Sequence, residues 1–141
     1  MNQPDPAEVL NRLLRVLYRS LPVYLAEVKP WSTQESPQAR AIEAIAADQL
    51  RLAERVGEAI LGHGGRIDRG SFPAEFTAKN DLAMEFLLRA AAEHLQRDVA
   101  AIQQCVADLA NAPFLRPLAE EALGSARGHL ESLKEKMKDE G

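Results

Sequence analysis

The sequence predicts an all-α protein, a four-helix bundle that forms one domain over residues 1–141. The composition is dominated by Ala, Leu, Glu and Arg, which favour helix. Apolar residues recur at three- and four-residue steps in four long stretches, which is the spacing of a buried helix face. No run of β-branched residues indicates a strand, and only 5% of the residues are aromatic.

The first helix is expected over residues 6–29. Asp5 provides a capping side chain, and Pro6 suits the first helical position because its missing N–H is not needed there. The apolar stripe of this stretch continues to Val28. Pro22 lies inside the stripe and is expected to kink the helix or to leave one carbonyl unpaired, since proline cannot donate the backbone hydrogen bond.

The later helices are expected over residues 37–61, 80–110 and 113–138. Ser36 and Pro37 repeat the start signal of the first helix, a capping side chain followed by proline. The third and fourth helices are separated by a short Asn-Ala-Pro break, so they are expected to form an antiparallel hairpin.

The link over about residues 62–79 sets the predicted topology. A link of that length is unusual in a compact domain. At roughly 3.3 Å per residue it can run the length of a helix of about 25 residues, roughly 37 Å. The sequence therefore predicts two antiparallel hairpins joined by a long crossover loop, which Phe72 and Phe76 would pin to the bundle.

Charge and composition exclude several classes of protein. The net charge of −4 and the pI near 5.4 give no basic footprint of the kind that nucleic-acid binders show. No run approaches the roughly 20 apolar residues of a membrane span. The single cysteine, Cys105, excludes an internal disulfide and suits a reducing compartment. A cytoplasmic protein that binds neither nucleic acid nor membrane is expected, with Cys105 as a buried, unreactive thiol.

Two segments resemble a known family. The run Leu10-Asn11-Arg12-Leu13-Leu14, followed by Tyr24, resembles the opening helix of bacterioferritins and other ferritin-like proteins. The middle link through Gly64-Gly65 looks like the loop of rubrerythrin-related families. The resemblance extends over essentially the whole chain in helix order, helix length and loops. It implies a ferritin-like four-helix bundle.

The resemblance also implies where a di-iron centre would lie. In that family all four helices send carboxylates inward, and two of them carry Glu-x-x-His. The six ligand positions fall on Leu17, Asp48, Arg51, Glu93, Ala126 and His129. Leu17, Arg51 and Ala126 cannot bind iron, which leaves a degenerate site. Asp48, Glu93 and His129 are the remnant metal positions, and we expect them to meet near the middle of the bundle.

Two of these positions have alternative interpretations. Arg51 is hypothesised to bridge Asp48 and Glu93, so that its permanent charge replaces the iron between two buried acids. Alternatively, Arg51 lies on the outer face of its helix beside Glu54. His129 is either a leftover ligand or an ordinary histidine at the flank of the core.

The first functional interpretation is a bundle that has lost its di-iron centre and serves as a non-catalytic interaction or oligomerisation module. It needs no cofactor and no catalytic residue. A homodimer is expected, with Leu14, Val16 and Tyr18 as candidate contacts, and any other protein partner is unidentified.

The alternative is a metalloprotein of iron binding, ferroxidase or peroxide chemistry, with an unconventional site made of Asp48, Glu93 and His129. Such chemistry needs a metal with open coordination positions. A small-ligand pocket in the vacated centre of the bundle is a third interpretation.

Overall fold

In a computed structural model that describes residues 4–31 and 36–140, every regular element is a helix, which confirms the predicted all-α class. The elements are α1 (Pro6–Tyr18), α2 (Leu21–Val28), α3 (Pro37–Gly62), the 3₁₀ helix η1 (Ala74–Asp81), α4 (Met84–Asp108) and α5 (Arg116–Glu140). No strand occurs in the part of the chain that the structure describes.

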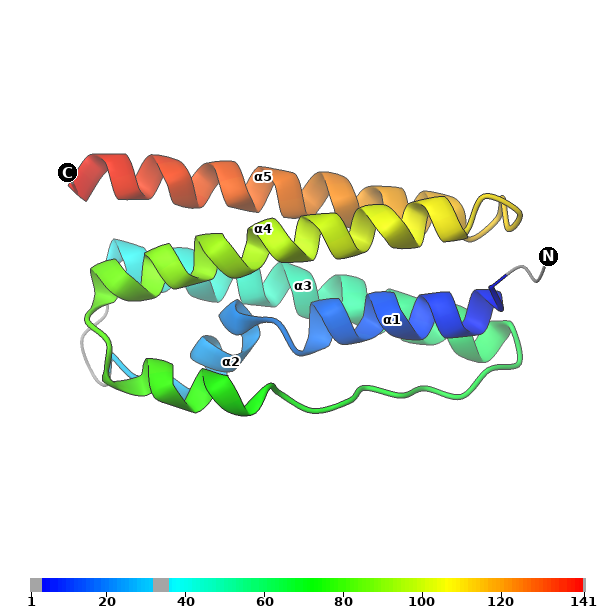
Figure 1. Cartoon of the computed structure of the whole chain (residues 1–141), viewed down its shortest axis with the longest axis horizontal. Helices are drawn as coiled ribbons and strands as arrows, with labels where there is room; N and C mark the ends of the chain where they lie inside the picture. The colour runs from blue at the N-terminus through cyan, green and yellow to red at the C-terminus, as the bar shows by residue number, and fades with distance from the viewer. Residues whose placement is uncertain (1–3, 32–35, 141) are drawn as a thin grey trace.

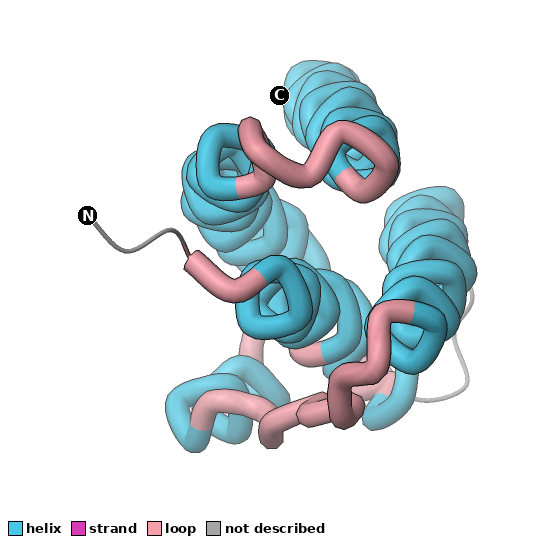
Figure 2. The backbone as a smooth tube through the Cα atoms, turned by 90° about the vertical axis from the view of Figure 1, so that its right-hand side faces the viewer, coloured by secondary structure: helices cyan, strands magenta, loops and turns pink. Residues whose placement is uncertain are grey.

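The helices lie side by side in one elongated bundle (Figure 1). Helices α1 and α3 run in opposite directions, and so do α4 and α5. Between them, residues 63–83 lead from the end of α3 back along the bundle to the start of α4, so that α3 and α4 point the same way. The end-on view shows this crossing segment along one side of the helices (Figure 2). We call residues 63–83 the crossing segment.

The first predicted helix is divided in two. Ser20 lies between α1 and α2, and its Oγ accepts a hydrogen bond from the Val23 N–H at 3.2 Å, which caps α2. Pro22 then occupies the first turn of α2, where its missing N–H costs nothing. The expected kinked helix over residues 6–29 is therefore wrong, because a serine cap next to a proline starts a new helix.

The third predicted helix also begins later than expected. Residues 74–81 form η1 instead of an irregular loop and the start of a long helix, and α4 begins only at Met84. Phe76 is buried, and its ring lies 5.6 Å from that of Tyr24 and 5.2 Å from that of His94. Phe72 packs edge-on against Tyr24 at 5.3 Å. These rings hold the crossing segment on the bundle.

Polar contacts attach the rest of the crossing segment to α1. The Asn11 side chain donates to the Arg66 carbonyl at 2.7 Å and accepts from the Asp68 N–H at 2.8 Å. Arg19 Nε donates to the Gly70 carbonyl at 3.1 Å. An amide that bonds the backbone in both directions fixes the path of the segment along the helix.

The apolar core consists of two clusters placed end to end. The first packs side chains from α1, the second half of α3, the second half of α4 and the first half of α5. The second packs α2, the first half of α3, the crossing segment, the first half of α4 and the second half of α5. Each of α3, α4 and α5 contributes to one cluster with one half and to the other cluster with its other half, so the change from one cluster to the other falls near the middle of the bundle.

Gly124→Ala and Gly128→Ala should each stabilise the chain. Both glycines lie inside α5, and a Cβ at either would meet no atom within 4 Å. Alanine loses less backbone entropy in a helix, so the free energy of unfolding should rise by about 0.5–1 kcal/mol per substitution. Urea denaturation measures this change.

Gly65→Ala is the control of opposite sign. There the added Cβ would lie 2.8 Å from the Ala7 Cβ, and overpacking of this kind costs about 1–3 kcal/mol. A loss of stability in the α5 variants would contradict an open α5 surface.

Candidate functional site

A layer of polar side chains separates the two apolar clusters. Along the chain, the change from one apolar cluster to the other falls beside a polar residue in four places. These residues are Ser20 between Leu17 and Leu21, Gln49 between Ile45 and Leu52, Asp98 between Leu95 and Val99, and His129 between Ala126 and Leu130. We call these four residues, together with Asp48 and Ser125, the polar layer. It is the candidate site, since an apolar core is interrupted by polar groups only at a cost.

On the α1–α3 side, the layer is a closed buried pair. Ser20 and Gln49 are each 3% exposed. The Ser20 hydroxyl donates to Gln49 Oε1 at 2.6 Å while its oxygen accepts from Val23 N–H. A buried polar group with its hydrogen bonds made costs little, so this pair is a structural contact.

On the α3–α5 side, the layer centres on the Asp48 carboxylate. Its Oδ2 lies 2.8 Å from His129 Nε2 and 2.5 Å from Ser125 Oγ. Its Oδ1 accepts a hydrogen bond from Arg51, one turn further along α3. Ser125 and His129 occupy one face of α5, four residues apart, which brings both side chains to the same oxygen.

These partners stabilise the ionised form of Asp48. Partial burial opposes ionisation, but hydrogen bonds from Ser125, Arg51 and His129, and the charge of His129 when protonated, lower the pKa of Asp48 from 3.8 to about 2. The carboxylate is therefore an anion at neutral pH, with a donor on each oxygen.

Ser125, His129 and Asp48 do not form a nucleophilic triad. A carboxylate only accepts hydrogen bonds, so both the Ser125 hydroxyl and His129 Nε2–H donate to Asp48. The Nε2 atom that lies 3.1 Å from Ser125 Oγ then carries a proton and has no lone pair with which to take the hydroxyl proton. The arrangement clamps two helices together and does not activate the serine.

Polar contacts attach α5 to α3 in a second place. Arg55 Nη1 lies 2.6 Å from Glu121 Oε2, two turns along α3 from Asp48. The apolar packing of α5 is mainly against α4. The Asp48 cluster and this ion pair are thus the polar contacts that attach α5 to α3.

Asp98 is the exception within the layer. Its Oδ2 is enclosed and has no hydrogen-bond partner in the described part of the chain. Burial raises the pKa of Asp98 to about 7, and the nearby Arg97 opposes this only in part. Asp98 is therefore largely a neutral carboxylic acid below pH 7.

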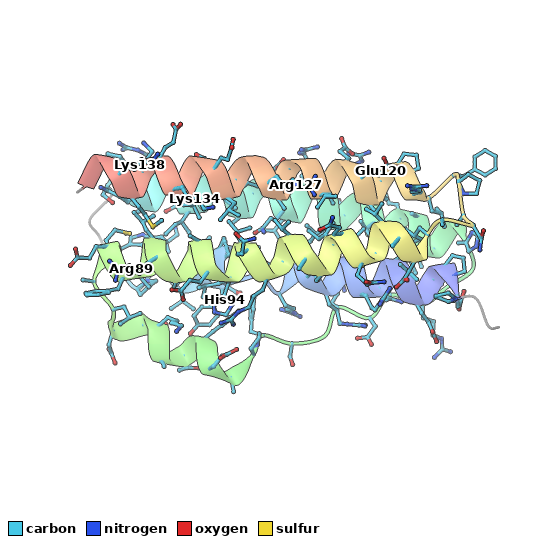
Figure 3. The ribbon with its side chains drawn as sticks, turned by 45° about the horizontal axis from the view of Figure 1, so that its top comes forward. Arg89, His94, Glu120, Arg127, Lys134 and Lys138 are labelled. Carbon is cyan, nitrogen blue, oxygen red and sulfur yellow. The ribbon has the colours of Figure 1, made fainter. Side chains whose placement is uncertain are left out.

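The predicted remnant positions meet only in part. Asp48 and His129 are in direct contact, whereas Glu93 is exposed and lines a shallow hollow on the outer face of α4 and α5, with Arg89 and Lys134. Figure 3 labels the last two on neighbouring helices. The predicted meeting of all three remnants is wrong for Glu93, because α4 turns that position outward.

The other implied positions are occupied as follows. Leu17 and Ala126 are buried in the first apolar cluster. The Arg51 side chain is 60% exposed and pairs with Asp48, and no ion pair of the described residues joins it to Glu93. The Arg51 bridge thus exists on the Asp48 side alone.

Asp98 and Ser125 belong to the polar layer but were not predicted from the sequence. Asp98 continues the apolar seam of α4 formed by Leu88, Ala91, Leu95, Ile102, Cys105 and Leu109, at alternating steps of three and four. An acid on that seam was the signal for a buried carboxyl group. Ser125 gave no comparable signal, because serine is common on exposed helix faces.

The residues present do not fit a di-iron centre. Both oxygens of Asp48 are engaged, and the Arg51 guanidinium at Oδ1 would repel a divalent cation. Within the described residues, no three His, Cys, Asp or Glu side chains form a group that could hold a metal ion. The aliphatic side chains of Leu17 and Ala126 supply no donor atom.

Cys105 is buried, as expected, with Sγ 3.9 Å from the Val9 carbonyl oxygen. Burial raises the pKa of its thiol, which keeps it protonated and weakly nucleophilic.

Among the described residues, no helix combines the length and the apolar character needed to cross a membrane. Comparisons of the chain with protein-family models, curated proteins and solved structures found no match.

Asp48→Asn should lower stability in a pH-dependent way. The pKa of Asp48 is lower in the folded chain than its usual 3.8, so the carboxylate stabilises the fold above pH 3.8 and this contribution is lost as the pH falls towards 2. The difference in unfolding free energy between wild type and variant should therefore shrink between pH 6 and pH 2.5, measured by urea denaturation.

The control for this experiment is Asp81→Asn. Asp81 is exposed and takes no part in an ion pair of the described residues. A difference for Asp48→Asn that stays the same at every pH would contradict the stabilising role of its charge.

Asp98→Asn should have the opposite pH dependence. The folded-state pKa of Asp98 is raised to about 7, so wild-type stability relative to the variant should fall as the pH rises from 3.8 to about 7, and stay constant above. Asparagine has the shape of the neutral acid, so the variant should match wild type near pH 4 and exceed it at pH 8. Equal stability at pH 8 would contradict an enclosed carboxyl group.

Proposed function

We propose that this chain is a ferritin-like four-helix bundle that has lost di-iron chemistry and serves as a non-catalytic interaction or oligomerisation module. The observation that carries the proposal is the state of Asp48. Where ferritin-like helices would direct metal ligands, this carboxylate is satisfied by Arg51, Ser125 and His129. The Asp48 carboxylate thus has a hydrogen-bond donor on each oxygen without a metal cation.

The arrangement of the helices supports the ferritin-like part of the proposal. Two pairs of oppositely directed helices are connected by a segment that travels the length of the bundle (Figure 1). This is the connection that bundles with a single long crossover use. Support comes from topology and from the resemblance in the first helix and the middle link.

The polar layer lacks the groups that catalysis needs. Metal-dependent oxidation needs an ion with open coordination positions, and the donors here are aimed at one another. Acyl transfer needs a base beside a nucleophile. The His129 Nε2–H donates a hydrogen bond to Asp48, so this nitrogen has no lone pair with which to act as that base. The only enclosed acceptor without a partner among the described residues is Asp98 Oδ2, a single atom on a neutral carboxyl group.

The alternative, iron binding with ferroxidase or peroxide chemistry, would have to use Asp48 and His129 without Glu93. Two residues that are already hydrogen-bonded to each other make a poor iron site, because one iron ion needs more ligands than they supply.

Aerobic incubation with ferrous iron, followed by desalting and elemental analysis, tests the proposal. Wild type should oxidise iron at the rate of buffer alone and retain no more of it than the Asp48→Ala, His129→Ala double variant. Near-stoichiometric iron on wild type, absent from the double variant, would establish a metal site at the polar layer and overturn the proposal. Circular dichroism of both proteins checks that the bundle is intact.

A further inference from the structure

A hollow lies between α4 and α5 on their outer face, with a volume of about 410 Å³. Its apolar lining comes from Ala92 of α4 and from Leu130 and Met137 of α5. The methyl group of Ala92 is too short to fill the space between the two helices. Met137 is half-buried, and its unbranched side chain can adapt to the shape of a partner. The hollow can therefore bury apolar side chains that come from outside the chain.

The hollow follows the two helices for about two turns. Its lining residues on α4 extend from Arg89 to Arg97, eight positions or about 12 Å along the helix. On α5 they are Leu130, Lys134 and Met137, at steps of four and three, which places them on one side of that helix. Helices α4 and α5 pack against each other in opposite directions, so the two rows lie along each other (Figure 1). A groove of this form receives a helix through apolar side chains at positions i, i+3 or i+4, and i+7.

The charged side chains that line the hollow are mainly positive. Arg89 and Arg97 lie on the α4 side and Lys134 on the α5 side, while Glu93 is the one acid of the lining. All four residues are exposed. None of the three cations takes part in an ion pair within the described residues. Since the whole chain has a net charge of −4, a positive hollow is not expected from its composition.

An aromatic ring holds Arg89 at the edge of the hollow. The Arg89 guanidinium lies 5.5 Å from the centre of the Phe86 ring, one turn earlier in α4. Phe86 is itself 45% exposed, so it extends the apolar surface beyond the end of the hollow. Figure 3 shows Arg89 and Lys134 on the two neighbouring helices. An apolar strip with cations on both sides is complementary to an apolar strip with acids on both sides.

We propose that this hollow is a docking site for an acidic amphipathic helix of another protein. Apolar side chains on one face of that helix enter the hollow and cover its apolar lining. Its carboxylates meet Arg89 and Arg97 on one side and Lys134 on the other, and an arginine can bind a carboxylate through two parallel hydrogen bonds. The inference rests on the proposed interaction role and states the chemistry of the partner.

A helix fits this surface better than a membrane or a nucleic acid does. Attachment to an anionic membrane takes about four to eight clustered cations, whereas the lining here has three, with Glu93 among them. Glu131 and Glu135 are also exposed on α5, and a lipid surface or a nucleic-acid backbone would repel them. A helix in the hollow contacts the lining and leaves these acids in solvent.

Fluorescence anisotropy with the full chain and a labelled synthetic peptide tests the docking site. The peptide is a helix of about four turns, with leucines at i, i+3 and i+7 and glutamates on both sides of them. Its dissociation constant should lie below about 100 µM and should rise with salt, because the charges are exposed. A peptide of the same composition in which leucines and glutamates alternate has no apolar helix face, and should bind at least about tenfold more weakly.

Charge variants locate the bound peptide. Arg89→Glu and Lys134→Glu should each raise the dissociation constant about tenfold, since repulsion replaces attraction. Arg69→Glu is the control, because Arg69 is exposed on the crossing segment, on the side of the bundle opposite α5 (Figure 2), and it should have no effect. Glu93→Gln should lower the constant about twofold, whereas Glu54→Gln on α3, with the same change in net charge, should not. Circular dichroism confirms that each variant is folded.

Three results would overturn the docking site: no saturable binding up to about 1 mM, equal binding of both peptides, or equal weakening by the Arg69 control. Binding to phosphatidylcholine–phosphatidylserine vesicles that Arg89→Glu abolishes, without binding of the peptide, would overturn it in favour of a membrane contact. Iron retained at Asp48 and His129 would overturn the loss of metal chemistry and leave the docking site standing. A chain that binds neither peptide nor iron would give the reverse outcome.

Discussion

The shared Asp48 carboxylate is the contact on which the arrangement of this bundle depends. Apolar packing explains how α5 lies on α4, but α5 reaches α3 through Asp48, Ser125 and His129, with Arg55 and Glu121 beside them. Hydrogen bonds from Ser125, Arg51 and His129 lower the pKa of this carboxyl group, and Arg51 adds a permanent positive charge beside it. A metal ion could supply that charge too, and here the chain supplies it with a side chain.

The polar layer also explains why the core is divided. Ser20 between α1 and α2, and one polar residue on each of α3, α4 and α5, fall where the two apolar clusters meet. Burying a polar group costs little free energy where its hydrogen bonds are made, as between Ser20 and Gln49 and between Asp48 and its three donors. The cost is higher at Asp98, whose enclosed oxygen has no partner among the described residues.

Helical periodicity predicted the all-α class, and local cap chemistry explains where the expectations were wrong. Ser20 followed by Pro22 is a start signal of the same kind as Ser36 followed by Pro37, yet the apolar stripe through Leu17 and Leu21 hid the break between α1 and α2. Of the three remnant positions expected to meet, Asp48, Glu93 and His129, only Asp48 and His129 lie in contact. Glu93 was misplaced because the rotation of α4 is set by its seam, on which Asp98 lies. Ser125 could be recognised only once α5 was placed against α3.

A double-mutant cycle between Asp48 and His129 tests the central claim, that this contact fastens α5 to α3. The free energies of unfolding of wild type, Asp48→Ala, His129→Ala and the double variant would be compared at pH 7. The account predicts a coupling energy of about 0.5–3 kcal/mol, as for residues in one hydrogen-bond network. Changes that add to within about 0.3–0.5 kcal/mol, as for independent sites, would contradict it.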